Sequence, residues 1–456
     1  MTNNSSRQYR VLSLFSGGMG LDLGLEQTGR FRTVACIEKE PAFCETIRRN
    51  RDAGRLPAEL QVLQADLSQL DPEATLRQLG IEPGSIDVVV GGPPCQSFST
   101  AGRRGTTQDP RGTLLWDFLR FVSFVEPKMF LMENVRGLLS AALVHRAIAE
   151  RPDKGGSPLR EEEEPGSVVR LFAKDLSSIS GGYVLDIFEV NAVNYGAPQL
   201  RERALFFGNR LGRRVDFPPP THGPDDSQNG QTSLFGERSL RAWRTLGDAL
   251  ANLHDPTPQI MDFSPRKKAF LERVPAGSNW RSLPEEIQKE SMGRAWHAKG
   301  GRSGWWRRLT MDLPCPTLVT MPNHASTSLC HPTETRALSV REYARIQEFP
   351  DNWEFSGTLS QQYAQIGNAV PTRLGSVAGA VISKELDSVC LPDAGRSEYP
   401  ELSKTGSYEP RVVYLQSHVR TRQWFKDGET VVWEADSCNT KARYSEPKTM
   451  HRTKGV

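Results

Sequence analysis

The stretch Asp87-Val-Val-Val-Gly-Gly-Pro-Pro-Cys95-Gln-Ser-Phe-Ser99 decides how this chain folds and where its chemistry lies. The mostly apolar run Ile86–Val90 predicts a buried strand that the Gly-Gly-Pro-Pro break ends. Cys95 follows directly, and residues just past the carboxyl end of a strand in an α/β sheet lie where such sheets bind ligands. Two prolines stiffen the backbone before the thiol, which suits a covalent nucleophile. A buried structural cysteine is the alternative interpretation.

Short apolar runs alternate with helical patterns through the first 210 residues. The runs are Tyr9–Phe15, Thr33–Glu38, Gln61–Ala65, Ile86–Val90, Met129–Met132, Tyr183–Val190 and Ala204–Phe207, with helices expected at Pro41–Arg49, Pro72–Leu79 and Gly112–Val125. This alternation predicts an α/β fold with a parallel, doubly wound, Rossmann-like sheet. The Gly- and Glu-rich stretch Arg151–Gly166 interrupts it and is expected to be a solvated, mobile insertion.

The pattern changes between residues 211 and 335, which are rich in loops and hold five of the nine Trp. Arginine and aromatic residues in loops suit an interface with a negatively charged partner, although the Trp residues could instead form a small core. Helical patterns return at Ser339–Gln347 and Pro371–Leu386. We therefore expect a catalytic and cofactor-binding domain (1–210), an inserted domain (211–335) and a return to the first domain (336–389).

The C-terminal extension, 390–456, is predicted to be a separate, partly disordered segment. Residues 411–416 favour a strand, Asp427-Gly428 favours a hairpin turn, and the chain from Glu446 on favours disorder. Because two strands alone are marginally stable in water, we expect residues 411–436 to pack as a small β appendage on the catalytic domain.

Composition excludes several classes of protein. A net charge of +3 is too small to argue nucleic-acid binding by itself. The seven cysteines form no Cys-x-x-Cys pair, so neither a metal site nor a disulfide scaffold is predicted, and a reducing cytosol fits best. No run approaches the roughly 20 apolar residues of a membrane helix, and the N-terminus lacks the apolar core of a signal peptide. A soluble, cytoplasmic protein without a membrane partner is expected.

Three successive strand ends carry residues suited to an adenosine pocket. Phe15-Ser-Gly-Gly-Met-Gly20 leads from a strand into a helix, where the backbone can approach a ligand closely. Glu38 ends the next predicted strand, where it could accept ribose hydroxyls. Asp66 ends the third, where a carboxylate could accept from an adenine amino group. The pattern alone does not distinguish one adenosine cofactor from another.

Two further groups lie at predicted strand ends. Glu133 follows the run Met129–Met132, beside the strand before Cys95 if the winding is regular, and could serve as a general acid; a turn or helix-capping role is the alternative. Arg201 and Arg203 alternate with other residues, so their guanidiniums are predicted to point the same way and to meet an anion, a carbonyl or Glu133.

These blocks resemble the DNA (cytosine-5) methyltransferases in order and spacing. The matching blocks are Phe15-Ser-Gly, Glu38, Asp66, Gly92-Pro-Pro-Cys-Gln, Glu133-Asn-Val, Gln199-x-Arg-x-Arg, Gly367-Asn-Ala-Val-Pro371 and the stretch 336–350. The resemblance covers about residues 11–383 and does not reach the tail. The family usually has Asp where Ser13 stands and Gly where Met19 stands, but Gly17, Gly18 and Gly20 keep the turn open.

The resemblance implies a class I methyltransferase that moves a methyl group from S-adenosylmethionine to carbon 5 of a flipped-out cytosine in duplex DNA. Cys95 would add to carbon 6, and Glu133 would protonate or strongly hydrogen-bond N3. Arg203 would hold O2, and Arg201 would support the site. The implied cofactor pocket comprises Phe15, Ser16, Gly17, Gly18, Gly20, Glu38, Asp66, Leu114, Asn368 and Ala369. The inserted domain would recognise the target, with DNA contacts at Ser99, Arg307, Arg308 and Thr317.

Other activities stay open at this point. A tRNA cytosine-5 methyltransferase of the same superfamily has similar blocks, though usually a smaller recognition region. A non-catalytic DNA-binding relative would lack Cys95, Glu133 or the Gly-rich turn, and all three are present. A restriction–modification or orphan methylase acting as a monomer is expected, with a separate restriction endonuclease as a partner that the sequence neither requires nor excludes.

Overall fold

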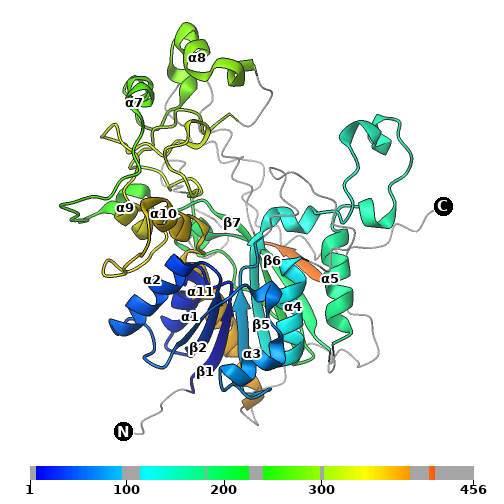
Figure 1. The fold of residues 1–456 in the computed structure, drawn as a ribbon. Helices are drawn as coiled ribbons and strands as arrows, with labels where there is room; N and C mark the ends of the chain where they lie inside the picture. The colour runs from blue at the N-terminus through cyan, green and yellow to red at the C-terminus, as the bar shows by residue number, and fades with distance from the viewer. Residues whose placement is uncertain are drawn as a thin grey trace, which may run out of the picture.

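The computed structural model describes residues 7–94, 113–179, 182–224, 240–297, 302–390 and 410–415. A sheet of eight strands forms the centre of the fold (Figure 1). Its strand order is β10-β6-β7-β5-β4-β1-β2-β3. The strands are β1 Tyr9–Leu14, β2 Phe31–Glu38, β3 Gln61–Gln64, β4 Val88–Gly91, β5 Met129–Val135, β6 Val184–Asn191, β7 Glu202–Asn209 and β10 Arg411–Tyr414. All seven strands predicted in the first 210 residues are confirmed, within two residues of their ends except at β5, which continues three residues beyond the predicted Met132.

One strand corrects the prediction of a parallel sheet. β7 is antiparallel to both of its neighbours, β5 and β6, while the other pairs are parallel. The connection from β6 to β7 spans residues 192–201 and contains one short 3-10 helix, Ala192–Tyr195. A parallel pair needs a crossover of about a dozen residues or more, usually a helix. The chain therefore turns back at the carboxyl end of β6.

Helices cover both faces of the sheet, as a doubly wound fold requires. α3 (Pro72–Gln78), α4 (Leu114–Val125) and α5 (Ser167–Ser177) pack on one face, and α1 (Gly20–Glu26) and α11 (Thr372–Cys390) on the other. Strand β4 shows the period-two alternation: Val89 joins the first core, and Val88 and Val90 join the second. The apolar run that predicted a buried strand is thus buried on both faces.

Helices α1 and α11 approach each other closely through glycine. A Cβ on Gly24 would lie 2.1 Å from the Thr372 carbonyl oxygen, and one on Gly375 would lie 2.4 Å from that of Leu21. Both side chains must therefore be absent for the helices to meet. This contact brings the last helix of the chain beside the first, so the catalytic domain is discontinuous in sequence.

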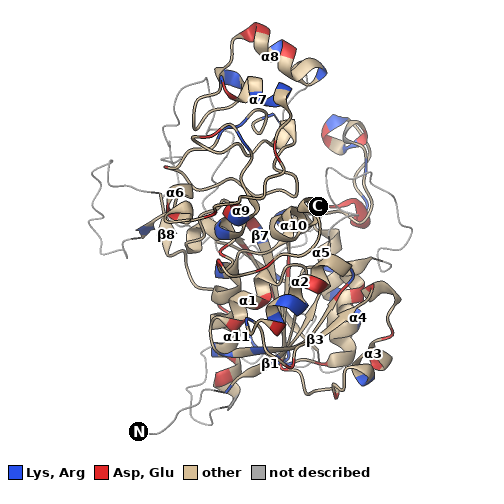
Figure 2. Cartoon of the chain, turned by 60° about the vertical axis from the view of Figure 1, so that its left-hand side comes forward, with Lys and Arg blue, Asp and Glu red and all other residues tan. Residues whose placement is uncertain are grey.

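The inserted domain stands above the carboxyl ends of the strands (Figure 1). It contains β8 (His222–Gly223), β9 (Arg241–Ala242), α6 (Leu246–Leu250), α7 (Pro265–Leu271) and α8 (Glu285–Met292). Trp280 and Trp306 lie in a core of its own with Phe263 and Phe270, so the alternative that Trp forms a core is confirmed for these two. Lys and Arg are visible on α7, and both charge signs on α8 (Figure 2).

After the inserted domain, the chain returns to the catalytic domain, where it packs against α2 (Pro41–Asp52) and forms the last helices. α2, α9 (Val340–Ile346) and α10 (Leu359–Asn368) share a core between the sheet and the inserted domain. In the part of the chain that the structure describes, no helix is long and apolar enough to cross a bilayer. Stretch 151–166, predicted to be a solvated insertion, is anchored by Glu163, whose buried carboxylate pairs with Arg146 and Arg160.

The tail contributes a strand to the main sheet. β10 lies at its edge, parallel to β6, and Arg411 pairs with the buried Asp186. The predicted strand is confirmed at 411–414, but it extends the central sheet where a separate β appendage was expected. The predicted hairpin at Asp427-Gly428 and the segment from Glu446 lie outside the described residues.

Candidate functional site

The Gly-rich turn after β1 forms one wall of the site. Phe15, Gly17 and Met19 all have left-handed backbones, with φ of 55°, 53° and 66°. At Gly20 a Cβ would lie 2.3 Å from the Val370 carbonyl oxygen, so only glycine fits. Such strained backbone persists where the surroundings enforce it, often at ligand sites. The turn therefore lies against the segment after α10, which includes the predicted cofactor residue Ala369.

Glu38 connects this turn to the end of β2. Its Oε2 accepts a hydrogen bond from the Gly17 amide at 2.8 Å, and its Oε1 accepts from the Glu40 amide at 2.9 Å. The side chain is buried, and burial raises the pKa of Glu38. The structure thus brings Glu38 to the Gly-rich turn, as the sequence predicted.

Asp66 lies at the neighbouring strand end, after β3. Its Oδ2 pairs with Lys39 Nζ at 2.8 Å, which holds the pKa of Asp66 below its usual value, and its Oδ1 accepts from the Ser68 amide. Arg120 of α4 donates to the carbonyl oxygens of Leu67 and Leu70. These bonds hold the middle of α4, the helix that begins at the predicted cofactor residue Leu114, beside the turn that follows Asp66.

The second part of the site surrounds the residues that lead to Cys95. A Cβ on Gly92 would lie 3.2 Å from Glu133 Oε2, so Glu133 touches the backbone at Gly92. The buried Asn134 donates from Nδ2 to the Pro93 carbonyl oxygen at 3.0 Å. The predicted site residues Cys95 and Ser99 lie outside the described residues, which stop at Pro94 and resume at Thr113. The prediction that β5 lies beside the strand before Cys95 is confirmed.

Arg203 and Glu133 form an ion pair across β5 and β7. The distance from Arg203 Nε to Glu133 Oε1 is 2.5 Å, and both side chains are largely buried. The sequence predicted that Arg203 would meet an anion, a carbonyl or this carboxylate. The pair leaves Glu133 Oε2 on the side of Gly92. Glu133 Oε2 therefore lies beside Gly92, three residues before Cys95 in the sequence, while the other carboxylate oxygen binds the Arg203 guanidinium.

Arg201 reaches other partners. Its side chain is 1% exposed and donates to the carbonyl oxygens of Leu318, Gly367 and Asn368. Burial, with a smaller effect of Arg203, lowers the pKa of Arg201 well below its usual value. The two arginines were predicted to point the same way, but they bind different groups because β7 begins only at Glu202, after Arg201. The predicted carbonyl partners are confirmed for Arg201.

The predicted DNA contacts of the inserted domain divide into two kinds. Arg308 is buried, and its guanidinium donates to protein oxygens of Leu271, Val274, His331, Glu334 and Thr335. Thr317 donates to the Leu200 carbonyl oxygen at 2.6 Å. Their geometry gives both a structural use and does not support a DNA contact. Arg307 donates from Nε to the Ser328 carbonyl oxygen at 3.3 Å, and burial lowers its pKa.

Sequence reasoning missed three buried polar residues near the site. Asp22, in the first turn of α1, is 2% exposed, and burial raises its pKa to about 7. The signal was present, since its helix is otherwise apolar or glycine up to Glu26. Asn134 lies in the block Glu133-Asn-Val, but no role for its side chain was predicted. Gln347 is fully buried and bonds to Gln199, and no local pattern marks two side chains 148 positions apart.

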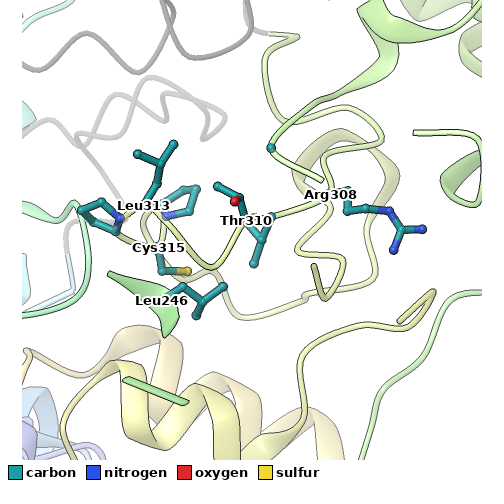
Figure 3. Close-up of a pocket in the computed structure, with 9 residues that line it drawn as sticks. Leu246, Arg308, Thr310, Leu313 and Cys315 are labelled. Carbon is teal, nitrogen blue, oxygen red and sulfur yellow. The ribbon is translucent and has the colours of Figure 1, made fainter. Parts of the chain in front are cut away.

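A small pocket lies at the base of the inserted domain, away from these groups (Figure 3). It is narrow, and apolar groups from Leu246, Leu309, Leu313 and Pro316 contribute most of its lining. Burial raises the pKa of the Cys315 thiol to about 12, and the Arg308 guanidinium points away from that thiol (Figure 3). We interpret it as a packing gap. Among the described residues, no His, Cys, Asp and Glu cluster could hold a metal ion.

Comparisons with known proteins agree on one family. The model of the C-5 cytosine-specific DNA methylases matches residues 9–151 and 161–384, and the gap falls within the insertion. The chain is 36% identical over 400 residues to Type II methyltransferase M.Eco47II of Escherichia coli, covering 85% of this chain and 82% of the relative. It is 34% identical over 375 residues to M.Sau96I of Staphylococcus aureus, covering 82% and 75%.

Two solved structures share the fold. A DNA modification methyltransferase encoded within a prophage (E. coli) is 24% identical, with a TM-score of 0.51 over 84% of this chain and 99% of that chain. The S. pombe Dnmt2 methyltransferase is 16% identical, with a TM-score of 0.50 over 84% and 100%. At these identities the likeness concerns the fold alone.

Proposed function

Because the chain belongs to the C-5 cytosine-specific DNA methylase family and is a DNA cytosine methyltransferase of the restriction–modification type, we propose that it uses S-adenosylmethionine and a covalent Cys95 adduct. The substrate is a cytosine flipped out of duplex DNA, because its ring atoms are inaccessible inside the stack. The observation that carries the proposal is the convergence of Glu133, Asn134 and Arg203 on the backbone that leads to Cys95.

The residues at the strand ends fit the cofactor. The turn 15–20 has no room for a Cβ at Gly20, and the carboxylates of Glu38 and Asp66 lie at the ends of β2 and β3. The remaining residues that we assign to the pocket are Leu114, Asn368 and Ala369. When bound, S-adenosylmethionine supplies an electrophilic methyl group.

The chain's own groups have to make carbon 5 of cytosine nucleophilic. The Cys95 thiolate adds to carbon 6, which turns carbon 5 into an enamine-like centre and places negative charge toward N3 and O2. Glu133 Oε2, on the Gly92 side, protonates or hydrogen-bonds N3, and the Arg203 guanidinium donates a hydrogen bond to O2. Loss of the carbon 5 proton after methylation restores the ring double bond and expels the thiolate.

Asn134 and Arg201 act through other residues. Asn134 holds the Pro93 carbonyl oxygen, two residues before the thiol, and so orients the nucleophile. Arg201 holds the backbone at Gly367 and Asn368. In the inserted domain, Arg307 is a stronger candidate for a DNA contact than Arg308. The Arg307 side chain is half-buried and donates to the Ser328 carbonyl oxygen, whereas that of Arg308 is buried and donates to five protein oxygens.

Labelled methyl transfer to unmethylated duplex DNA tests the proposal, with tRNA as the competing substrate. Wild type should label DNA, Cys95→Ala should not, and bisulfite sequencing should locate the modified cytosines. A duplex with 5-fluorocytosine at that position should form a denaturation-resistant adduct through Cys95, because fluorine cannot leave as a proton. Turnover by Cys95→Ala, or labelling of tRNA alone, would contradict the proposal.

Glu133→Gln separates chemistry from cofactor binding. It keeps the size of the side chain and should lower kcat by roughly 10²–10⁴, the usual contribution of a positioned acid, with cofactor affinity unchanged. Loss of cofactor binding measured by calorimetry would make Glu133 a structural residue of the pocket instead.

A further inference from the structure

The backbone at the end of α10 is held by side chains from two other parts of the chain. Arg201 Nη2 donates to the Gly367 carbonyl oxygen at 2.9 Å and to that of Asn368 at 3.3 Å. Gln347 Nε2 donates to the carbonyl oxygens of Ile366 at 2.6 Å and Ala369 at 2.9 Å. Asn368 and Ala369 belong to the pocket that we assign to the cofactor, so its wall depends on these two side chains.

The same side chains also hold the segment by which the inserted domain returns, residues 315–319. Arg201 Nη1 donates to the Leu318 carbonyl oxygen at 3.4 Å. The Leu318 amide donates to Gln199 Oε1 at 3.0 Å, and Gln199 in turn donates to Gln347 Oε1 at 2.9 Å. Thr317 Oγ1 donates to the Leu200 carbonyl oxygen. Both polar groups of the Leu318 backbone are thus hydrogen-bonded to side chains of the segment just before β7.

The two held segments also touch each other directly. A Cβ on Gly367 would lie 2.7 Å from the Val319 carbonyl oxygen, so the backbones are in contact without an intervening side chain. Packed backbones of this kind transmit a displacement, because close-packed interiors have little free volume. A shift of residues 315–319 therefore has to move residues 367–369 as well.

The chemistry of the junction is unusual for a purely structural contact. Arg201 is 1% exposed, and the oxygens that its side chain binds are neutral carbonyls. Its Nε is buried without a hydrogen-bond partner in the described part of the chain. A desolvated cation of this kind is costly, and apolar packing would hold two segments together at least as well. The guanidinium fork does what apolar packing cannot, because it fixes the direction of three carbonyls at once.

We propose that Arg201 is a positioning residue that couples duplex binding by the inserted domain to affinity for the cofactor. A duplex that displaces segment 315–319 moves the carbonyls of residues 367 and 368 through Arg201, and so changes the pocket at Asn368. The coupling is reciprocal, as thermodynamic linkage requires. The inference rests on the proposed function, since it takes duplex DNA and an adenosyl cofactor as the two ligands.

The test measures the affinity of S-adenosylhomocysteine by calorimetry, with and without a duplex that carries the methylated target. In wild type the two dissociation constants should differ by roughly 5- to 150-fold, the usual range of coupling between sites. Arg201→Lys keeps the charge but lacks the fork, so the ratio should fall toward 1. Thr317→Val, which removes one bond of the same junction, should lower the ratio by less. Arg77→Lys, on the exposed face of α3, is the matched control.

The possible outcomes support or overturn the coupling as follows. A ratio of 1 in wild type, or an unchanged ratio in both junction variants, overturns the coupling. A lower melting temperature of Arg201→Lys with an unchanged ratio shows a structural role only, and also overturns it. If Arg201→Lys does not fold, the ratio of Thr317→Val decides. If wild type binds no S-adenosylhomocysteine at all, the proposed function itself fails, so the two failures are distinguishable.

Discussion

Replacing Arg411 by alanine should loosen the eighth strand of the sheet. Arg411 Nε donates to Asp186 Oδ1 at 2.7 Å, and the Asp186 side chain is fully buried in β6. Asp186 has two other partners, Arg214 Nη1 at 3.2 Å and the Val215 amide at 2.7 Å. The variant therefore weakens the partnership of a buried carboxylate without abolishing it.

The expected loss of stability follows from these contacts. A hydrogen bond to a charged group contributes about 1.5–3 kcal/mol, and losing the sole partner of a buried charge costs about 3–5 kcal/mol. Since Arg214 and Val215 remain, we expect about 2 kcal/mol. In domains of 150–250 residues, each kcal/mol shifts Tm by roughly 2–4 °C, so the decrease should be several degrees. Arg411→Lys, which keeps the charge, should lose less.

The loss should depend on pH in a defined direction. Burial raises the pKa of Asp186 even with Arg411 present, and removing Arg411 raises it further. A carboxyl with a raised folded pKa contributes stability that is greatest in acid and is lost as pH rises through that pKa. The difference between wild type and Arg411→Ala should thus be largest at neutral pH and should shrink in acid, where Asp186 is protonated.

Thermal and urea unfolding at pH 5 and pH 7.5 measure this difference, and a double-mutant cycle with Asp186→Asn isolates the pair. An interaction energy of about 0.5–3 kcal/mol is expected for residues in contact. Strictly additive single-variant effects, or equal melting temperatures of wild type and Arg411→Ala, would refute the assignment of β10 to the sheet.

Four other substitutions test separate parts of the protein. Burial raises the pKa of Asp22 from 3.8 to about 7, so wild-type stability should fall between these pH values by at most about 1.4 kcal/mol per unit, and Asp22→Asn should remove that slope in urea titrations. Asn134→Ala should lower kcat by roughly 10²-fold through misplacement of the nucleophile, with S-adenosylhomocysteine affinity unchanged; a change in affinity alone would contradict its role. Arg308→Met should cost more than about 3 kcal/mol by leaving carbonyls unpaired. Arg307→Met, which loses the bond to Ser328, should lower Tm by less and should reduce the salt dependence of duplex binding by roughly one ion.

The strands of the catalytic domain could be predicted because each one is a short apolar run that ends at a Gly, Pro, Asp or Asn. Their ends also brought Gly17 and Glu38 together, since residues at the carboxyl ends of neighbouring strands must lie together. Glu133 was expected just after its strand, but it lies inside β5, which continues to Val135. The direction of β7 follows from the connection 192–201, which is too short for a crossover. The predicted strands left residues 191–203 between them, which is long enough for one, so the sequence did not settle it. The position of β10 was not, since no pattern links Arg411 to Asp186 across 225 positions.

Side chains that bind distant backbone carbonyls could not be predicted. Arg201 meets Leu318 and Gly367, which are 117 and 166 positions away, and carbonyl groups leave no trace in the sequence. Arg308 is the converse case. An arginine in a loop-rich, aromatic region is typical of a nucleic-acid interface, yet this one is buried and binds backbone oxygens of its own domain. The residue type and its region predicted an exposed Arg308 side chain, but the packing of the inserted domain buries it.

The predicted boundary at residue 335 falls inside a continuous set of contacts. Arg336 pairs with both Glu334 and Glu342 of α9, and buried His331 lies 3.6 Å from the same Glu342. Residues 315–318 are bonded to the start of β7. Residues 315–335 therefore belong structurally to both domains. Parts of 211–314 are shared as well, since Trp243 donates to Asn194 and Arg244 pairs with Glu348. An exchange of 212–333 with a relative would alter this shared segment as well as the residues that read DNA. An exchange of 212–314 keeps residues 315–335 intact, and if kcat is unchanged, a changed bisulfite pattern would then report on target recognition.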